Sequence, residues 1–268
     1  MHIPRKALIA TVLGCVTAFV IGAQPAMAAS SVNYIALGDS YASGVGSGSY
    51  TSESGSCLRS TLAASQLWAN AHAPASYRSV ACSVAKTTDV TANQVSALSA
   101  STTLVSITIG GNDVGFSTVM EDCVLYSTST CVNEVNHAEY EAQTYLPGWL
   151  DTTYNGIRSR APYAKVVVLG YPRFYHDLWY CVGLSSTDRQ KINEGADVLD
   201  SVISAAASRH GGFSFADVRS RFAADHEICD GSSSWLHSVD WTDLVQSYHP
   251  TASGQSRGYL PALDTVTG

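Results

Sequence analysis

A serine hydroxyl follows the first apolar run after residue 31. The run Asn33–Leu37 is followed directly by Gly38, Asp39 and Ser40. If the run is a strand and a helix comes next, the Ser40 hydroxyl lies beside backbone N–H groups and the partial positive charge of a helix N-terminus. Those are the conditions that a nucleophilic serine needs. Taken alone, the stretch more often indicates a helix cap, because Asp and Ser are the commonest N-caps.

Two further stretches supply a side-chain amide and a histidine. Asn112 follows Gly110 and Gly111, which let the backbone approach a ligand closely, and its amide offers an N–H to a developing oxyanion. A Gly-Gly turn with an Asx cap is the alternative. His249 precedes Pro250, which favours an extended loop at the histidine and a helix that begins with the proline. Seven other histidines compete with it, and a lone histidine is more often structural than catalytic.

The segments that would position these side chains alternate in type. Short runs rich in Val and Ile suit strands covered on both faces: Asn33–Leu37, Tyr77–Ala81, Leu104–Ile109, Lys165–Leu169 and Phe213–Val218. Longer segments with helical spacing lie between them: Thr61–Ala71, Thr88–Leu98, Val132–Arg160 and Asp188–Arg209. This alternation predicts a three-layer α/β domain with a mainly parallel sheet. Ligands of such sheets bind at the carboxyl ends of the strands, where Gly38, Gly110 and Gly170 lie.

The N-terminus has the pattern of a secretory signal peptide. Arg5 and Lys6 precede an apolar stretch that is short for a membrane span, and an Ala-x-Ala site ends at Ala28. We therefore expect residues 1–28 to be removed and residues 29–268 to fold as a single domain. An N-terminal membrane anchor is the alternative, which the proline and small residues after the apolar stretch disfavour.

Composition and charge limit the partners. The chain is 46% hydrophobic, which is enough for a large core. Its formal charge of −7 becomes −9 once the two cations of the signal peptide are removed. This acidity argues against nucleic acid or an anionic membrane surface as a partner, but not against a neutral lipid substrate.

The cysteines favour disulfides over metal binding. One of the seven lies in the signal peptide, and an even number in an exported chain indicates disulfides, although six cysteines allow 15 pairings. No CxxC spacing occurs, which argues against structural zinc. The stretch from His226 to Cys229 lacks a matching second pair of ligands, so Cys229 is interpreted as a disulfide partner.

Together the three stretches resemble conserved blocks of a known family. "GDSYASG", "GGNDVGF" and "SYHP" are similar to blocks I, III and V of the GDSL/SGNH hydrolases, and in particular to small secreted actinobacterial lipases and phospholipases A1. The resemblance runs from about Tyr34 to the C-terminus. It implies a three-layer α/β/α sandwich with a flavodoxin-like sheet. It also implies cysteine pairing in chain order: Cys57–Cys82, Cys123–Cys131 and Cys181–Cys229.

The resemblance also implies roles for individual residues. Ser40 matches the nucleophile and His249 the general base. Gly110 and Asn112 match the loop whose Asn side chain binds the tetrahedral oxyanion, and the backbone N–H of Ser40 would be a further donor. Relatives carry a donor glycine in a Cys-Ser-Gly-Ala run, where this chain has Val84. Val84 still offers its N–H, but the backbone angles and the width of the cleft are in question there.

A second departure concerns the partner of the histidine. Many family members have an aspartate three residues before it, and this chain has Gln246. In the nearer relatives, the backbone carbonyl two residues before the histidine, here that of Ser247, accepts a hydrogen bond from Nδ1. We therefore expect a Ser40–His249 dyad oriented by a carbonyl, with Asp243 as the rival carboxylate.

The implied function is that of a secreted, extracellular carboxylic-ester hydrolase that cleaves acyl lipids through an acyl-enzyme on Ser40. Phospholipase A1 activity, carbohydrate-ester deacetylation and a binding module with a vestigial site are the alternatives. Aromatic residues near the strand ends favour an apolar acyl groove over the small polar pocket of a deacetylase, unless they belong to the core: Phe116, Tyr171, Phe174 and Tyr175. We expect a monomer with no cofactor, no metal, no nucleic-acid partner and no stable membrane anchor.

Overall fold

The computed structural model describes residues 1–2, 31–223 and 225–267. Apart from its first two residues, the expected signal peptide lies outside this part of the chain and stays a prediction. Within the described ranges, no helix is both long and apolar enough to cross a membrane.

Five parallel strands form one sheet in the order β2-β1-β3-β4-β5. The strands are β1 (Asn33–Gly38), β2 (Ser76–Ser79), β3 (Leu104–Thr108), β4 (Lys165–Leu169) and β5 (Phe213–Ala216). This is the flavodoxin-like order. Every residue of β3 is buried, as is every residue of β4 after the first, as expected for strands covered on both faces.

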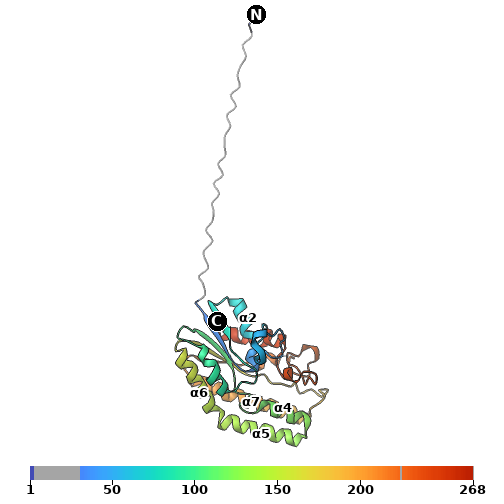
Figure 1. The fold of residues 1–268 in the computed structure, drawn as a ribbon. Helices are drawn as coiled ribbons and strands as arrows, with labels where there is room; N and C mark the ends of the chain where they lie inside the picture. The colour runs from blue at the N-terminus through green and yellow to red at the C-terminus, as the bar shows by residue number, and fades with distance from the viewer. Residues whose placement is uncertain (3–30, 224, 268) are drawn as a thin grey trace.

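Helices cover both faces of the sheet, which confirms the three-layer prediction (Figure 1). One layer contains α2 (Ala64–His72) and α9 (Leu260–Thr267), which contact each other. The other contains α4 (Phe116–Leu125), α5 (Thr128–Thr144), α6 (Leu146–Arg160) and α7 (Ser186–Ser208). Short helical turns complete the described fold: α1 (Ser40–Ser43), η1 (Ser52–Cys57), α3 (Thr87–Asp89), η2 (Val90–Gln94), η3 (Val95–Ala97), α8 (Arg219–Phe222), η4 (Gly231–Ser233), η5 (Leu244–Gln246) and η6 (Gly254–Tyr259).

The helix boundaries differ from the sequence prediction where capping and proline decide them. The expected helix Val132–Arg160 is two helices that meet at Tyr145, because Pro147 lies in the first turn of α6 and has no N–H for a helix interior. Helix α7 begins two residues earlier than predicted, because Ser185 and Asp188 form a capping box. The expected helix Thr88–Leu98 is a succession of short α, π and 3₁₀ turns.

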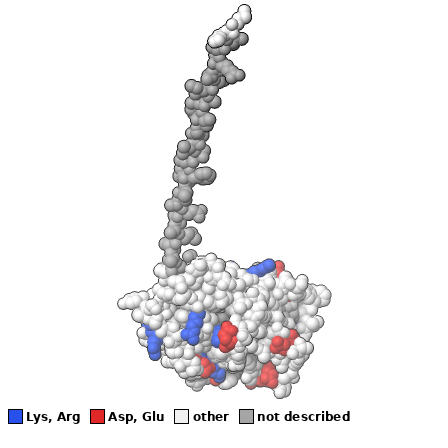
Figure 2. All heavy atoms as spheres, turned by 45° about the horizontal axis from the view of Figure 1, so that its top comes forward, with Lys and Arg blue, Asp and Glu red and all other residues white. Residues whose placement is uncertain are grey.

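Charged side chains are sparse on the surface. They make up 14% of the chain, and on the face that Figure 2 shows they are scattered and of both signs. The described residues on that face therefore form no broad patch of one charge to which a polyanion would bind.

Three disulfides join the loops, and they link the cysteines in chain order. Cys57–Cys82 connects η1 to the segment after β2. Cys123–Cys131 joins α4 to α5. Cys181–Cys229 joins the segment after β4 to the segment after α8.

Val84, at the position where the resemblance implies a glycine, lies in the left-handed region of backbone space. Its φ is +59°, and its side chain is 71% exposed. A β-branched residue is sterically unfavourable at positive φ. The valine therefore keeps the turn between β2 and α3 at a cost in backbone strain, and its exposed side chain offsets little of that cost.

We predict that Val84→Gly raises the free energy of unfolding by about 1 kcal/mol, because glycine adopts positive φ without a Cβ clash. Chemical denaturation of the oxidised protein measures the change. Val84→Ala is the matched control: it keeps a Cβ at the strained position, so its gain should be smaller. A glycine variant no more stable than the valine protein would show that the turn is unstrained.

Candidate active site

Ser40 and His249 are hydrogen-bonded to each other. His249 Nε2 lies 2.8 Å from Ser40 Oγ, although the two residues are 209 positions apart. Ser40 is the first residue of α1 and is buried. Asp39 is the N-cap of α1 and accepts a hydrogen bond from the N–H of Tyr41. The capping interpretation therefore holds for Asp39, while the Ser40 hydroxyl is left to face the histidine.

Backbone groups hold His249 in place. Its Nδ1 lies 3.0 Å from the carbonyl oxygen of Ser247. If Nδ1 donates to that carbonyl, Nε2 is left to accept from the serine hydroxyl. The histidine loop is paired with His237 through two backbone hydrogen bonds. The hydroxyl of Tyr41 donates to the carbonyl of Tyr248 at 2.6 Å, which ties the loop to α1.

The nearby carboxylates are directed elsewhere. Asp240 accepts hydrogen bonds from Thr242 and from the Gln246 amide. Asp243 is exposed. Among the described residues, no carboxylate oxygen is hydrogen-bonded to His249.

Burial lowers the pKa of His249 to about 4 from its ordinary value of 6.5, and the neighbouring His237 adds to this effect. A low pKa keeps the imidazole neutral at physiological pH. Only a neutral imidazole can accept the serine proton, so burial keeps His249 in the form that can act as a base.

Hydrogen-bond donors lie on three segments that follow strand ends at the same edge of the sheet. The Ser40 N–H is one of the first in α1, which have no acceptor within their own helix. The Asn112 side-chain amide donates one N–H to the carbonyl of Ala85 at 3.0 Å and keeps a second. This bond ties the loop that follows Gly110 to the turn that contains Val84, whose N–H no described residue accepts.

A buried network that the sequence did not reveal links the serine turn to the Asn112 loop. The Tyr171 hydroxyl accepts from the N–H of Gly111 at 3.1 Å and donates to the Asp39 carboxylate. Asp200 accepts from the N–H of Tyr171 at 2.8 Å. Burial raises the pKa of Asp39 to about 7. The one sign of this network in the sequence is the position of Tyr171, which directly follows Gly170, the third of the glycines at strand ends.

An apolar cavity of about 60 Å³ opens beside Gly111, between α4, α5 and α7. Three of the four predicted aromatics line it: Phe116, Tyr171 and Phe174. The fourth, Tyr175, lies in a different groove and hydrogen-bonds to the Tyr248 hydroxyl at 2.9 Å. Tyr171, Phe174 and Tyr175 belong to the core, as the alternative interpretation expects, and an acyl-binding role for these aromatics stays a prediction.

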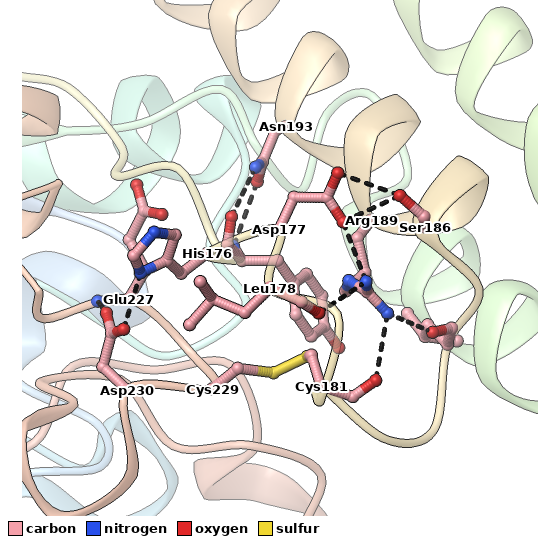
Figure 3. Close-up of a disulfide and its surroundings, with 12 residues drawn as sticks. His176, Asp177, Leu178, Cys181, Ser186, Arg189, Asn193, Glu227, Cys229 and Asp230 are labelled. Atoms are coloured by element: carbon pink, nitrogen blue, oxygen red, sulfur yellow. Dashed lines mark hydrogen bonds and ion pairs between the residues drawn. A yellow bond between two sulfur atoms is a disulfide. The ribbon is translucent and has the colours of Figure 1, made fainter.

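One group of at least three candidate metal ligands lies within the described part of the chain. His176, Asp225 and Asp230 bring ligand atoms within 4.8 Å of one another. His176 Nδ1 is already hydrogen-bonded to Asp230 at 2.7 Å (Figure 3). Among the described residues, none of the three is hydrogen-bonded to Ser40 or His249. The nearby Cys229 is in a disulfide and is not a free ligand.

Comparisons with known proteins agree on one family. Residues 36–257 match the model of the GDSL-like lipase/acylhydrolase family. The chain is 52% identical to Lipase 1 of Streptomyces coelicolor over 242 residues, which cover 90% of this chain and 89% of that protein.

Two solved structures are similar throughout. The crystal structure of phospholipase A1 from Streptomyces albidoflavus NA297 has a TM-score of 0.84 and 54% identity, covering 87% of this chain and 98% of that one. The extracellular lipase from Streptomyces rimosus has a TM-score of 0.85 and 50% identity, covering 88% and 99%.

We predict that Asp240→Asn and Asp243→Asn each change kcat/KM by less than about threefold, because neither carboxylate contacts His249. Hydrolysis of a dissolved short-chain ester measures this. A fall on the order of 10⁴ in either variant, as when a triad loses its orienting carboxylate, would show that a carboxylate orients the histidine.

The acid limb of the pH profile tests the environment of His249. The base must be unprotonated, so kcat/KM should rise with pH through the His249 pKa of about 4 and then stay level. The measurement is kcat/KM on a dissolved ester from about pH 3 to pH 8, with tryptophan fluorescence as the control for folding. A midpoint near the ordinary 6.5 would contradict the buried, neutral imidazole.

Tyr171→Phe should lower kcat by about tenfold with less effect on KM, because Gly111 and Asp39 lose their shared partner. Tyr154→Phe is the matched control, since the Tyr154 hydroxyl is buried without a hydrogen-bond partner. Steady-state kinetics on a dissolved ester separates the two constants. Equal kcat values for the two variants would show that the network does not position the site.

Proposed function

The chain belongs to the GDSL-like lipase/acylhydrolase family, and from that premise we propose that Ser40 and His249 carry out its chemistry. The protein is a serine ester hydrolase that acts on lipids. The observation that carries the proposal is the 2.8 Å contact between Ser40 Oγ and His249 Nε2.

In the proposed reaction, Ser40 Oγ attacks the acyl carbonyl while His249 Nε2 takes the hydroxyl proton. The tetrahedral intermediate collapses, and the leaving alcohol receives that proton from Nε2. A water molecule then attacks the acyl-serine with His249 again as base, which releases the fatty acid and restores Ser40. The Ser247 carbonyl holds the ring orientation and offers a dipole to the imidazolium.

The intermediate's negative oxygen needs donors aimed at its position. We assign this role to the backbone N–H groups of Ser40 and Val84 and to the free N–H of Asn112. Gly110 has a φ of +124°, which glycine adopts without strain, and it starts the turn that carries Asn112. The Tyr171 bond to Gly111 supports the same loop.

The apolar cavity beside Gly111 is the proposed acyl-chain site, and its lining determines which esters fit. An apolar lining favours the hydrocarbon part of an acyl group over the polar groups of a carbohydrate, and a volume of about 60 Å³ holds the first carbons of such a chain. Triacylglycerol is the leading substrate and a phospholipid cleaved at its first acyl ester is the alternative. The relatives named lipase and phospholipase A1 support both. Initial rates on a triacylglycerol emulsion and on phosphatidylcholine vesicles distinguish them.

We also propose that residues 1–28 direct export and that residues 29–268 act as a monomeric extracellular domain without a cofactor. The three disulfides and the similarity to an extracellular lipase support secretion.

We predict that Ser40→Ala abolishes ester hydrolysis while the protein stays folded, because no other group supplies the nucleophile. An organophosphonate serine titrant, read by mass spectrometry, should label the wild type at one residue. His249→Ala should be nearly as inactive, since the two groups act as a unit. Labelling that persisted in Ser40→Ala would refute the assignment.

A further inference from the structure

Large apolar side chains stand in solvent on the segment Leu178–Leu184, between β4 and α7. Trp179 is 93% exposed and Val182 is 90% exposed, with Tyr180 half-exposed between them. A single exposed apolar residue is ordinary, but neighbouring ones on one loop are not. The segment follows the carboxyl end of β4, the same edge of the sheet as Ser40.

A second loop also has exposed apolar side chains. Trp241, Leu244 and Val245 are exposed on the segment that precedes His249, and Trp241 faces the same groove as the first loop. A groove of about 750 Å³ lies between the two loops, and Tyr180, Val182 and Trp241 all line it. We call the exposed residues of both loops the apolar rim: Trp179, Tyr180, Val182, Trp241, Leu244 and Val245.

The groove runs along the histidine loop. His237 and Tyr248 also line it. Tyr248 directly precedes His249, and the N–H of His237 donates to the carbonyl of His249 at 3.0 Å. Part of the apolar rim therefore lines a groove that also contains Tyr248, the residue before the proposed base.

The first loop is fixed rather than loosely extended. Arg189 of α7, a buried residue, donates to the carbonyl groups of Leu178, Cys181 and Leu184. The Cys181–Cys229 disulfide anchors the loop from its other side (Figure 3). A buried guanidinium and a cross-link thus hold a short segment on which Trp179, Tyr180 and Val182 are exposed. Pre-ordering of this kind lowers the entropy cost of binding.

The charges around the rim select among lipid surfaces. The segment 178–184 carries no charged side chain, and the segment 235–248 carries Asp240 and Asp243 but no Lys or Arg. Anionic headgroups would be repelled by these carboxylates and by the net negative charge of the chain. A neutral or zwitterionic surface offers apolar contact without that repulsion.

We propose that the apolar rim docks the protein on a zwitterionic lipid surface, with Trp179, Val182 and Trp241 inserted at the headgroup level. Tryptophan suits this depth because its ring is apolar and its N–H is polar. The groove then opens toward the lipid, so an ester enters it next to His249. This inference rests on the proposed function, because it concerns how the lipid substrate reaches Ser40.

The test uses binding without turnover. In the Ser40→Ala background, flotation with phosphatidylcholine vesicles measures partition directly. Trp179→Ser combined with Val182→Ser should weaken it by at least about tenfold, because two large apolar side chains lose their burial in lipid. Tyr163→Ser is the matched control: Tyr163 is 87% exposed but precedes β4, at the opposite edge of the sheet. Its partition should equal that of the parent.

A second readout separates docking from chemistry. With Ser40 intact, the rate on vesicles relative to the rate on a dissolved ester should fall in the double variant and not in Tyr163→Ser. Vesicle binding that is equal in parent and double variant, or that occurs only with phosphatidylglycerol and disappears in salt, would overturn the docking proposal. So would self-association through the rim in sedimentation without vesicle binding. Failure of the wild type to hydrolyse any ester, dissolved or in vesicles, would instead refute the proposed function.

Discussion

The close packing of β1 against β3 at Gly38 is the constraint on which the geometry of the site depends. A Cβ at Gly38 would lie 2.2 Å from the carbonyl oxygen of Thr108, so only glycine fits there. The buried Gln94 side chain pairs with both the N–H and the carbonyl of Gly38, at 2.7 and 2.9 Å. The end of β1 is therefore fixed against the end of β3. Ser40 follows one of these strand ends and Asn112 follows the other.

The histidine loop determines the orientation and the protonation state of His249. A carboxylate beside an imidazole would raise its pKa and stabilise its charged form, whereas a carbonyl orients the ring and contributes only a dipole. With Ser247 as the partner and the ring partly buried, His249 stays neutral in the resting protein. In the proposed mechanism, most of the stabilisation of the transition state would then come from the hydrogen-bond donors assigned to the oxyanion.

The sequence predicts those parts of the fold that depend on local pattern. Apolar runs and strand-end glycines indicate the parallel sheet and the edge at which Ser40, Asn112 and His249 gather. Helical periodicity continues on both sides of Pro147, so the pattern alone predicts one helix where the proline divides the segment into α5 and α6.

What the sequence could not predict depends on contacts between distant segments. The Tyr171–Asp39 bond joins residues 132 positions apart, and nothing in the local pattern around either residue indicates the other. Apolar residues such as Trp179 usually indicate burial. Their exposure results from Arg189 and a disulfide that hold their loop outside the core.

The most direct test of the proposed site is a crystal structure of the protein inhibited by a long-chain alkyl phosphonate, which mimics the tetrahedral intermediate. We expect phosphorus bonded to Ser40 Oγ and the first carbons of the alkyl chain directed to the cavity beside Gly111. The phosphonyl oxygen should accept hydrogen bonds from Ser40 N–H, Val84 N–H and the Asn112 amide, with His249 Nδ1 still on the Ser247 carbonyl. An adduct on another residue, or a phosphonyl oxygen directed to solvent away from these donors, would contradict the assignment.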